Sequence, residues 1–141
     1  MKFETLISKL VGIVEKASRA TGKNLSLPVL SCILIKSNKD SNTITLKSTN
    51  LDIGVEFNLP VKSSESGLVA VPGATLLNFL SSVGSDGEIK FAAVNDNLAI
   101  SFKNNTSTIK CFPKDDFPEI PSVNQEKKSR VKASDFINGI K

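Results

Sequence analysis

The sequence predicts an α+β domain in which two helices pack on an antiparallel sheet, with an internal pseudo-repeat. The order of a short strand, a helix and a run of alternating strands occurs twice along the chain. Each helical segment carries one apolar stripe, and packing both against a shared sheet would bury both stripes. The strand segments alternate apolar and polar residues, which is typical of antiparallel strands with one face in the core.

The composition excludes several classes of function. The chain has 141 residues, of which 40% are hydrophobic and 23% charged, enough for one soluble domain with its own core. It has no histidine, which excludes a histidine-based catalytic triad and a histidine metal site. A glycine-rich phosphate loop and a Gly-x-Ser-x-Gly elbow are also missing. We therefore expect a non-catalytic protein without a metal or cofactor.

The amino terminus and the cysteines favour a cytoplasmic protein that does not enter a membrane. Residues 1–5 contain a glutamate where a signal peptide would begin its apolar region, and no window of the chain reads as a spanning helix. Cys32 and Cys111 lie far apart in apolar strands, which favours free buried thiols, while a disulfide between them stays open at this point. Neither thiol has a histidine partner, so a nucleophilic role is disfavoured.

The first unit begins with a strand over residues 1–5 and an amphipathic helix over residues 6–20. Gly22 is suited to a left-handed cap after the helix, and Pro28 favours an extended entry into the strands. The apolar stripe of the helix should face the sheet; it consists of Leu6, Ile7, Leu10, Ile13, Val14 and Ala17.

Three strands follow, over residues 30–37, 43–48 and 51–59. The first is a continuous apolar run, which predicts cover on both of its faces. The third alternates, so one of its faces should lie in the core; that face carries Ile53, Val55, Phe57 and Leu59.

The second unit repeats this order after a connecting loop over residues 62–67. Its helix opens with a proline in the first turn. Tight turns are expected at Asn95-Asp96 and Asn104-Asn105, because asparagine and aspartate tolerate left-handed backbone. The expected ranges are 68–71 for the strand, 72–83 for the helix, and 88–94, 97–103 and 106–112 for the following strands.

The carboxyl-terminal part of the chain suggests a domain boundary. Residues 113–121 form a proline-rich exit, so we expect one domain over residues 1–121. Residues 122–130 are polar and indicate an interdomain linker. Residues 131–136 are similar to the strand end and helix start at residues 71–76, and we expect residues 131–141 to begin a second, truncated domain.

A basic side of the first helix is the candidate binding surface. Lys9, Lys16 and Arg19 recur roughly opposite the apolar stripe, and Lys23 lies just beyond the helix. Such a stripe favours contact with a phosphate backbone, and so few cations would give weak, salt-sensitive, sequence-blind binding. The alternative is an ordinary solvated helix face. The net charge of +4 does not decide between them, because residues 122–141 alone hold five Lys and Arg against two Asp and Glu.

Five short blocks are spread over the chain from residue 1 to about residue 121. They are Met1-Lys2-Phe3, Leu25-Ser26-Leu27-Pro28-Val29-Leu30, Leu46-Lys47-Ser48-Thr49-Asn50-Leu51-Asp52-Ile53, Val71-Pro72-Gly73-Ala74 and Phe112-Pro113-Lys114-Asp115-Asp116-Phe117-Pro118. In this order and spacing they resemble the N-terminal domain of the bacterial sliding clamp, the DNA polymerase III beta subunit. Residues 131–141 resemble the beginning of that family's second domain.

The resemblance implies the DNA clamp fold and a processivity factor without enzymatic activity. The family's chain has three similar domains, and two chains close head to tail into a homodimeric ring around double-stranded DNA, with helices lining the hole. Such a ring holds DNA without sequence specificity and tethers the replicative DNA polymerase after a clamp loader has placed it. The groove for polymerase and loader peptides lies between the family's second and third domains.

The same resemblance implies two sets of site residues. The loop before Leu27-Pro28 contacts DNA in the family, and Lys23 and Asn24 stand at the matching place, beside the helix cations Lys9, Lys16 and Arg19. The family's ring interface uses the second helix and the last two strands of this domain. The corresponding candidates here are Phe79, Lys103, Ile109 and Lys110.

A second function is compatible with the same residues: a freestanding β-rich module that binds partner peptides by strand addition. Residues 106–112 would form the binding strand if they lie at a sheet edge. This alternative predicts a monomer that binds peptide without further domains, whereas the clamp hypothesis predicts a ring that retains circular DNA.

Overall fold

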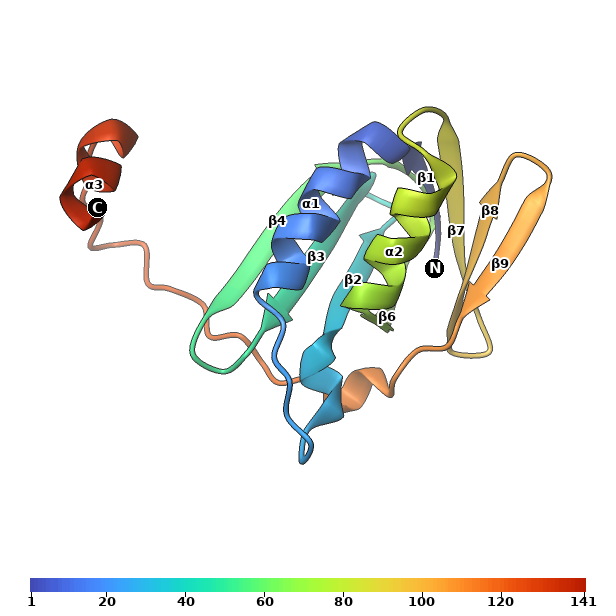
Figure 1. The fold of residues 1–141 in the computed structure, drawn as a ribbon, viewed down its shortest axis with the longest axis horizontal. Helices are drawn as coiled ribbons and strands as arrows, with labels where there is room; N and C mark the ends of the chain where they lie inside the picture. The colour runs from blue at the N-terminus through green and yellow to red at the C-terminus, as the bar shows by residue number, and fades with distance from the viewer.

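The computed structural model describes residues 1–141 and contains two antiparallel sheets with two helices packed on them (Figure 1). The strands are β1 (Lys2–Leu6), β2 (Cys32–Asn38), β3 (Thr43–Thr49), β4 (Gly54–Pro60), β5 (Lys62–Glu65), β6 (Gly67–Pro72), β7 (Glu88–Val94), β8 (Asn97–Phe102) and β9 (Asn105–Ile109). The helices are α1 (Ile7–Arg19), α2 (Gly73–Val83) and α3 (Ala133–Ile140), with short 3-10 helices η1 (Pro28–Ser31) and η2 (Lys114–Asp116).

The strands form two sheets instead of the single shared sheet that we expected. The larger sheet has the order β5-β1-β7-β8-β9, and the smaller has the order β4-β3-β2-β6. All neighbouring strands are antiparallel, so the predicted α+β class is confirmed.

The two repeat units are interlocked through their first strands. One unit is β1-α1-β2-β3-β4 and the other is β6-α2-β7-β8-β9. β1 pairs with β7 of the second unit, and β6 pairs with β2 of the first unit. Each three-stranded run is therefore completed by a strand from the other unit, and neither unit forms its sheet alone.

The main core joins both sheets to the apolar stripes of α1 and α2. Ile7, Leu10, Val14 and Ala17 of α1 are buried, as are Leu76 and Leu80 of α2. Leu6 is 44% exposed, because it ends β1 instead of beginning the helix. Phe3 of β1 stacks on Phe91 of β7 with ring centroids 4.8 Å apart. Burying one such side chain contributes about 1.5–3 kcal/mol.

The β7–β8 turn lies where the sequence predicted it. Asn95 and Asp96 have φ angles of 50° and 60°, the geometry of a two-residue hairpin turn. The β8–β9 turn is shifted by one residue, to Lys103-Asn104, and Lys103 has the left-handed φ of 53°. The shift follows from the core: Phe102 is buried and pairs with Asn105, so only residues 103 and 104 remain for the loop.

The connection between α1 and β2 also differs from expectation. Residues 28–31 form η1, so the strand begins only at residue 32. The helix ends at Ala20 with φ −93°, so Gly22 is no left-handed cap. Instead the Gly22 N–H donates to the Leu30 carbonyl at 2.8 Å, and a Cβ at Gly22 would lie 3.1 Å from the Asn50 Cα. The close approach of the two backbones favours glycine here, because a Cβ would need the Asn50 backbone to move by a few tenths of an ångström.

The β3–β4 connection removes two residues from the predicted strand. Leu51 has φ 79° and is 60% exposed, and Ile53 is 58% exposed, so the expected core position of Ile53 is wrong. The Asn50 side-chain oxygen accepts hydrogen bonds from the N–H groups of Asp52 (3.0 Å) and Ile53 (2.8 Å). This local turn competes with the strand, and β4 begins only at Gly54.

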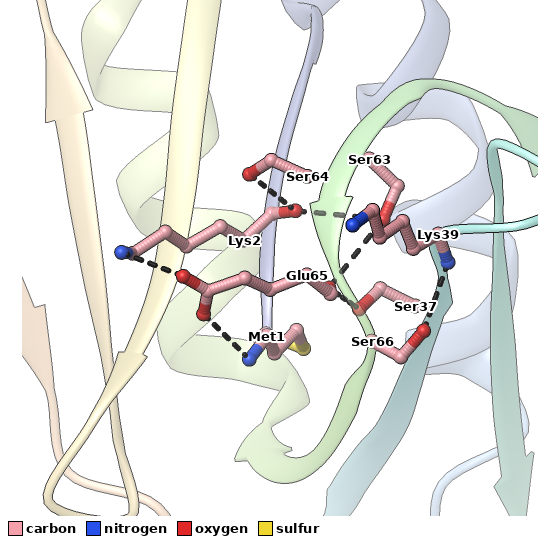
Figure 2. Close-up of polar contacts among 8 residues, drawn as sticks. All are labelled: Met1, Lys2, Ser37, Lys39, Ser63, Ser64, Glu65 and Ser66. Atoms are coloured by element: carbon pink, nitrogen blue, oxygen red, sulfur yellow. Dashed lines mark hydrogen bonds and ion pairs between the residues drawn. The ribbon is translucent and has the colours of Figure 1, made fainter.

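The predicted loop over residues 62–67 contains a strand. β5 pairs with β1, with Lys2 opposite Glu65 and Glu4 opposite Lys62. The Ser37 hydroxyl of β2 donates to the Glu65 carbonyl at 2.8 Å, which ties β5 to the smaller sheet as well (Figure 2). The segment is serine-rich and without an apolar alternation, so its strand conformation depends on its neighbours.

After β9 the chain crosses the outer side of the smaller sheet as an ordered segment, residues 112–121, which we call the exit strap. The Phe112 N–H donates to the Ala70 carbonyl of β6 at 2.9 Å. Phe117 is 9% exposed and packs into a second apolar cluster with Val29, Cys32 and Ala70. The proline-rich exit is therefore packed against the smaller sheet.

Residues 122–141 are exposed along their whole length, including α3. Phe136 and Ile140 of α3 are 58% and 70% exposed, so the apolar side of this helix has no partner. The second, truncated domain expected here stays a prediction. No helix of the chain has the length and hydropathy needed to cross a membrane.

Candidate nucleic-acid interface

α1 and α2 lie side by side on the same side of the two sheets and form one helical layer (Figure 1). Lys9, Lys16 and Arg19 are all exposed on α1, at spacings that place them along one side of the helix. A Cβ placed at Gly12, between them, has no atom within 4 Å. The predicted basic stripe is therefore an open surface of the helical layer.

The cations of this stripe differ in whether a neighbouring carboxylate compensates their charge. Arg19 donates to the Glu15 carboxylate at 2.6 Å, one helical turn away, so part of its charge is already compensated. Lys9 and Lys16 form no ion pair. Lys9 borders a shallow hollow with Glu4 and Glu88, and those carboxylates pair with other lysines. Lys16 and Arg19 also lie in the last turn of α1, where cations favour the helix dipole.

The exposed side of α2 contributes no charge to this surface. It carries Ala74, Thr75, Asn78, Ser81 and Ser82. The hydroxyl of Ser81 donates to the Leu77 carbonyl at 2.9 Å, and that of Ser82 to the Phe79 carbonyl at 2.7 Å. Their protons are thus used within the helix, and the attraction of the layer for an anion comes from α1.

Lys23 and Asn24 lie in the loop beyond the end of α1, and the structure separates their roles. The Asn24 side-chain oxygen accepts from the Ser26 N–H at 2.8 Å, and its carbonyl accepts from the Leu27 N–H at 3.3 Å. Asn24 therefore shapes the loop. Lys23 is exposed and unpaired, so it is the residue of the two that offers a charge to a phosphate.

β9 is an edge strand of the larger sheet, as the strand-addition alternative requires. Thr106 and Thr108 are exposed on it, while Ile109 is 7% exposed and belongs to the main core. The burial of Ile109 leaves little of its side chain for a partner. The alternation of threonine with Ile109 is visible in the sequence and identifies the two threonines as the outward residues.

The remaining interface candidates lie on different elements. Phe79 of α2 is half-buried and packs against the main core. The Lys103 ammonium lies 5.0 Å from the centroid of the Phe102 ring, in the β8–β9 turn. Lys110 is exposed directly after β9, and it borders a surface hollow with Asp96 and Asp115.

The two thiols lie in separate clusters and are free. Cys32 belongs to the small cluster beneath the exit strap, whereas Cys111 packs against the main core. Burial raises the pKa of Cys32 from 9.0 to about 11, and burial also raises the pKa of Cys111. Both groups stay protonated near neutral pH, which disfavours a nucleophilic role. No group of three or more His, Cys, Asp or Glu side chains is placed to hold a metal ion.

Comparison with known proteins gives a consistent family. The model of the DNA polymerase III beta subunit, N-terminal domain, matches residues 1–121. The beta sliding clamp of Synechococcus elongatus is 22% identical over 124 residues, which covers 88% of this chain and 33% of that protein. A beta sliding clamp sequence of Vibrio harveyi is 24% identical over 137 residues, which covers 96% of this chain and 93% of that sequence.

The fold comparison agrees. The crystal structure of the DNA polymerase III subunit beta from Pseudomonas aeruginosa matches with a TM-score of 0.79 at 21% identity, over 87% of this chain and 33% of that one. The chain spans about a third of the length of most of the curated relatives that it matches. The family match covers the chain through the proline-rich exit and ends at residue 121. The chain therefore belongs to the DNA polymerase III beta subunit family and carries the N-terminal domain of that family.

Proposed function

We propose that this chain acts as part of a ring-shaped sliding clamp that encircles double-stranded DNA and serves as a processivity factor. The observation that carries the proposal is the helical layer, in which the open basic side of α1 is presented beside a neutral α2, in a member of this family. In this arrangement the helices face DNA and the two sheets lie outside them.

The charge on the helical layer suits a protein that slides. Lys9, Lys16 and Lys23 are unpaired, and Arg19 is partly compensated by Glu15. A few phosphate contacts give weak, salt-dependent attraction without sequence information. Strong or sequence-specific binding would stop the ring from moving, so topological closure must supply the retention.

The homodimeric ring requires a contact between chains, and we assign it to the β9 edge and its surroundings. An edge strand offers unpaired backbone groups to a second chain. Phe79, Lys103 and Lys110 are the side chains we assign to this contact, with Ile109 supporting β9 from within the core. The replicative DNA polymerase and the clamp loader would bind through other domains of the complete protein.

The proposal includes no catalytic step and a cytoplasmic site of action. Relatives of this chain carry the name beta sliding clamp, and the thiols of the chain are held protonated by burial. The mechanism is mechanical: a closed ring keeps the polymerase near its template.

Topology provides the test. The complete protein is loaded onto nicked circular DNA by its clamp loader, and the retained protein is measured after gel filtration. The expected result is retention on the circle that disappears when the circle is linearised, because a ring can leave through a free end. Equal retention on circular and linear DNA would contradict an encircling mechanism.

The edge position of β9 also supports a second candidate, a module that binds partner peptides by strand addition. This candidate predicts that the 141-residue chain binds an extended peptide as a monomer, with chemical-shift changes confined to β8 and β9. Absence of such changes at a large excess of peptide would leave the clamp as the only candidate.

A further inference from the structure

Gly12 lies on the side of α1 that is opposite the core. Successive residues of an α-helix are rotated by about 100° around its axis. The four buried residues of α1 therefore share one side, and Gly12 lies about 180° from their mean direction. Gly12 is exposed, and a Cβ built on it would have no atom within 4 Å. The backbone of α1 is thus bare at the outermost line of the helical layer.

The fold gives no reason for a glycine at this position. Gly12 does not have the positive φ of Gly84, and no other segment approaches it. At Gly54, by contrast, a Cβ would lie 2.8 Å from the side chain of Ile120. Glycine inside a helix destabilises it relative to alanine. Because no contact within the chain offsets this loss at Gly12, the residue points to a partner that approaches the helix backbone there.

Two unpaired cations stand on either side of Gly12 along the helix. Lys9 precedes it by three residues and Lys16 follows it by four, so the two lysines are separated by about 10 Å along the helix axis. Neither lysine forms an ion pair, whereas Arg19, further along the same side, pairs with Glu15. An anion that rests on the bare backbone would lie between two ammonium groups without a competing carboxylate partner.

The surface around Gly12 is low on the side toward α2. The exposed residues of α2 are alanine, threonine, asparagine and serine, all with short side chains. A surface hollow of about 380 Å³ lies between the two helices beside Gly12, with Ser8 of α1 and Ser81 of α2 at its border. A bulky partner can therefore approach the Gly12 backbone without meeting a long side chain from the neighbouring helix.

We propose that Gly12 is the position at which a phosphate of duplex DNA comes into direct contact with the backbone of α1, between Lys9 and Lys16. The inference rests on the proposed function and adds to it the place and the closeness of one contact. The N–H groups in the middle of α1 are used within the helix, so glycine supplies the space and the two lysines supply the charge. Such a contact carries no sequence information, as sliding requires.

The test places a long neutral side chain at this position in the complete protein. Gly12→Gln keeps the net charge and favours the helix, so its thermal midpoint should be at least that of the wild type. Binding to a short duplex is measured by fluorescence anisotropy across a salt series. Gly12→Gln is expected to bind about 3- to 10-fold more weakly at low salt, with a slope of log K against log salt shallower by about 1. Gly12→Ala should fall between the wild type and Gly12→Gln.

Ser41→Gln is the matched control, because Ser41 is exposed in the β2–β3 turn and receives an equally long neutral side chain outside the helical layer. It should bind DNA as the wild type does. When Lys9→Gln and Lys16→Gln are already present, Gly12→Gln should weaken binding little further, since the cations that hold the phosphate are absent. Wild-type affinity in Gly12→Gln, an equal loss in Ser41→Gln, or a full further loss in the lysine double variant would overturn the proposal.

Retention of the wild type on circular DNA separates this inference from the proposed function. Retention depends on closure of the ring and not on the contact at Gly12. If the wild type is retained on the circle and Gly12→Gln binds the short duplex with unchanged affinity and slope, the contact alone is rejected. If the wild type is not retained on the circle, the proposed function is rejected and the contact with it.

Discussion

Two glycines of the helical layer differ in what their missing side chain does. Gly84 ends α2 with φ 89° and ψ −175°, a backbone region that is almost restricted to glycine. Gly12 lies inside α1 in open space, where glycine only weakens the helix. At the scale of single residues, one glycine is therefore required by geometry and the other is not.

The same substitution should have opposite effects at these two positions. Gly84→Ala is expected to lower the free energy of unfolding by about 1–3 kcal/mol, because alanine is strained at that φ. Gly12→Ala is expected to raise it by about 0.5–1 kcal/mol through helix propensity. Urea unfolding of the two variants measures both changes. A decrease in stability in Gly12→Ala would show that this face of α1 is more crowded than the structure has it.

Cys32 makes stability depend on pH in the alkaline range. Burial raises the pKa of its thiol from 9.0 to about 11, so the folded state holds a proton that the unfolded chain releases first. The stabilisation is fully present below pH 9 and is lost as the pH rises toward about 11. The free energy of unfolding should fall across this window.

Cys32→Ala should make the free energy of unfolding fall less steeply with pH. The measurement is the difference in this free energy between the variant and the wild type at each pH. Taking the difference removes the lysine titration that both proteins share. Cys111→Ala is the comparison variant, because burial raises the pKa of this thiol as well. A flattening confined to Cys111→Ala would assign the alkaline loss of stability to Cys111 and not to Cys32.

At the scale of elements, α1 and α2 share a layer but not a role. The apolar stripes of both helices reach the same core, while the outward side is basic on α1 and neutral on α2. The element to which we assign DNA attraction is therefore α1 with the loop that follows it. Replacing its unpaired cations, Lys9, Lys16 and Lys23, should leave packing intact, since all three side chains are exposed.

Lys9→Glu, Lys16→Glu and Lys23→Glu together should weaken residual DNA binding by the complete protein. The slope of log K against log salt is expected to become shallower by about 1 for each phosphate that the protein no longer neutralises. Fluorescence anisotropy across a salt series measures this slope. The matched control reverses Lys36, Lys39 and Lys114, three exposed lysines outside the helical layer, with the same change in net charge. Equal slopes for the two triple variants would reject a DNA-facing role for α1.

At the scale of the whole molecule, the exchange of first strands makes the two repeat units one folding unit. β1 lies in the sheet of the second unit and β6 in that of the first. Phe3 of β1 is 1% exposed and stacks on Phe91, so it links the start of the chain to a strand of the second unit. A destabilising substitution in one unit should therefore weaken the hydrogen bonding of both sheets.

Phe3→Ala is expected to lower the free energy of unfolding by about 3–5 kcal/mol, the decrease typical of removing a large buried aromatic side chain. Hydrogen exchange should then accelerate in β2–β3 and in β7–β8 together. Phe136→Ala serves as the control, because Phe136 is 58% exposed on α3 and should leave the unfolding midpoint unchanged. Retained protection in β2–β4 of the Phe3 variant would show that the units unfold separately.

Much of the element order was predictable because it depends on local periodicity. The stripes of α1 and α2 and the Asn95-Asp96 turn follow from side chains within a few residues of each other. The basic stripe was predictable for the same reason. The pairing of Arg19 with Glu15 and the loop-shaping role of Asn24 depend on side-chain geometry, which periodicity does not specify.

Four features follow from the sequence alone, because each depends on composition or on near neighbours: the α+β class, the two helices, the basic side of α1 and the absence of histidine chemistry. Three others required the folded chain: the division into two sheets, the strand β5 over residues 62–65 and the burial of Ile109. The same holds for the β8–β9 turn and for the contacts of Met1 with Gly67 and Glu65. These features arise from contacts between residues far apart in the chain, where distant partners outweigh local preference.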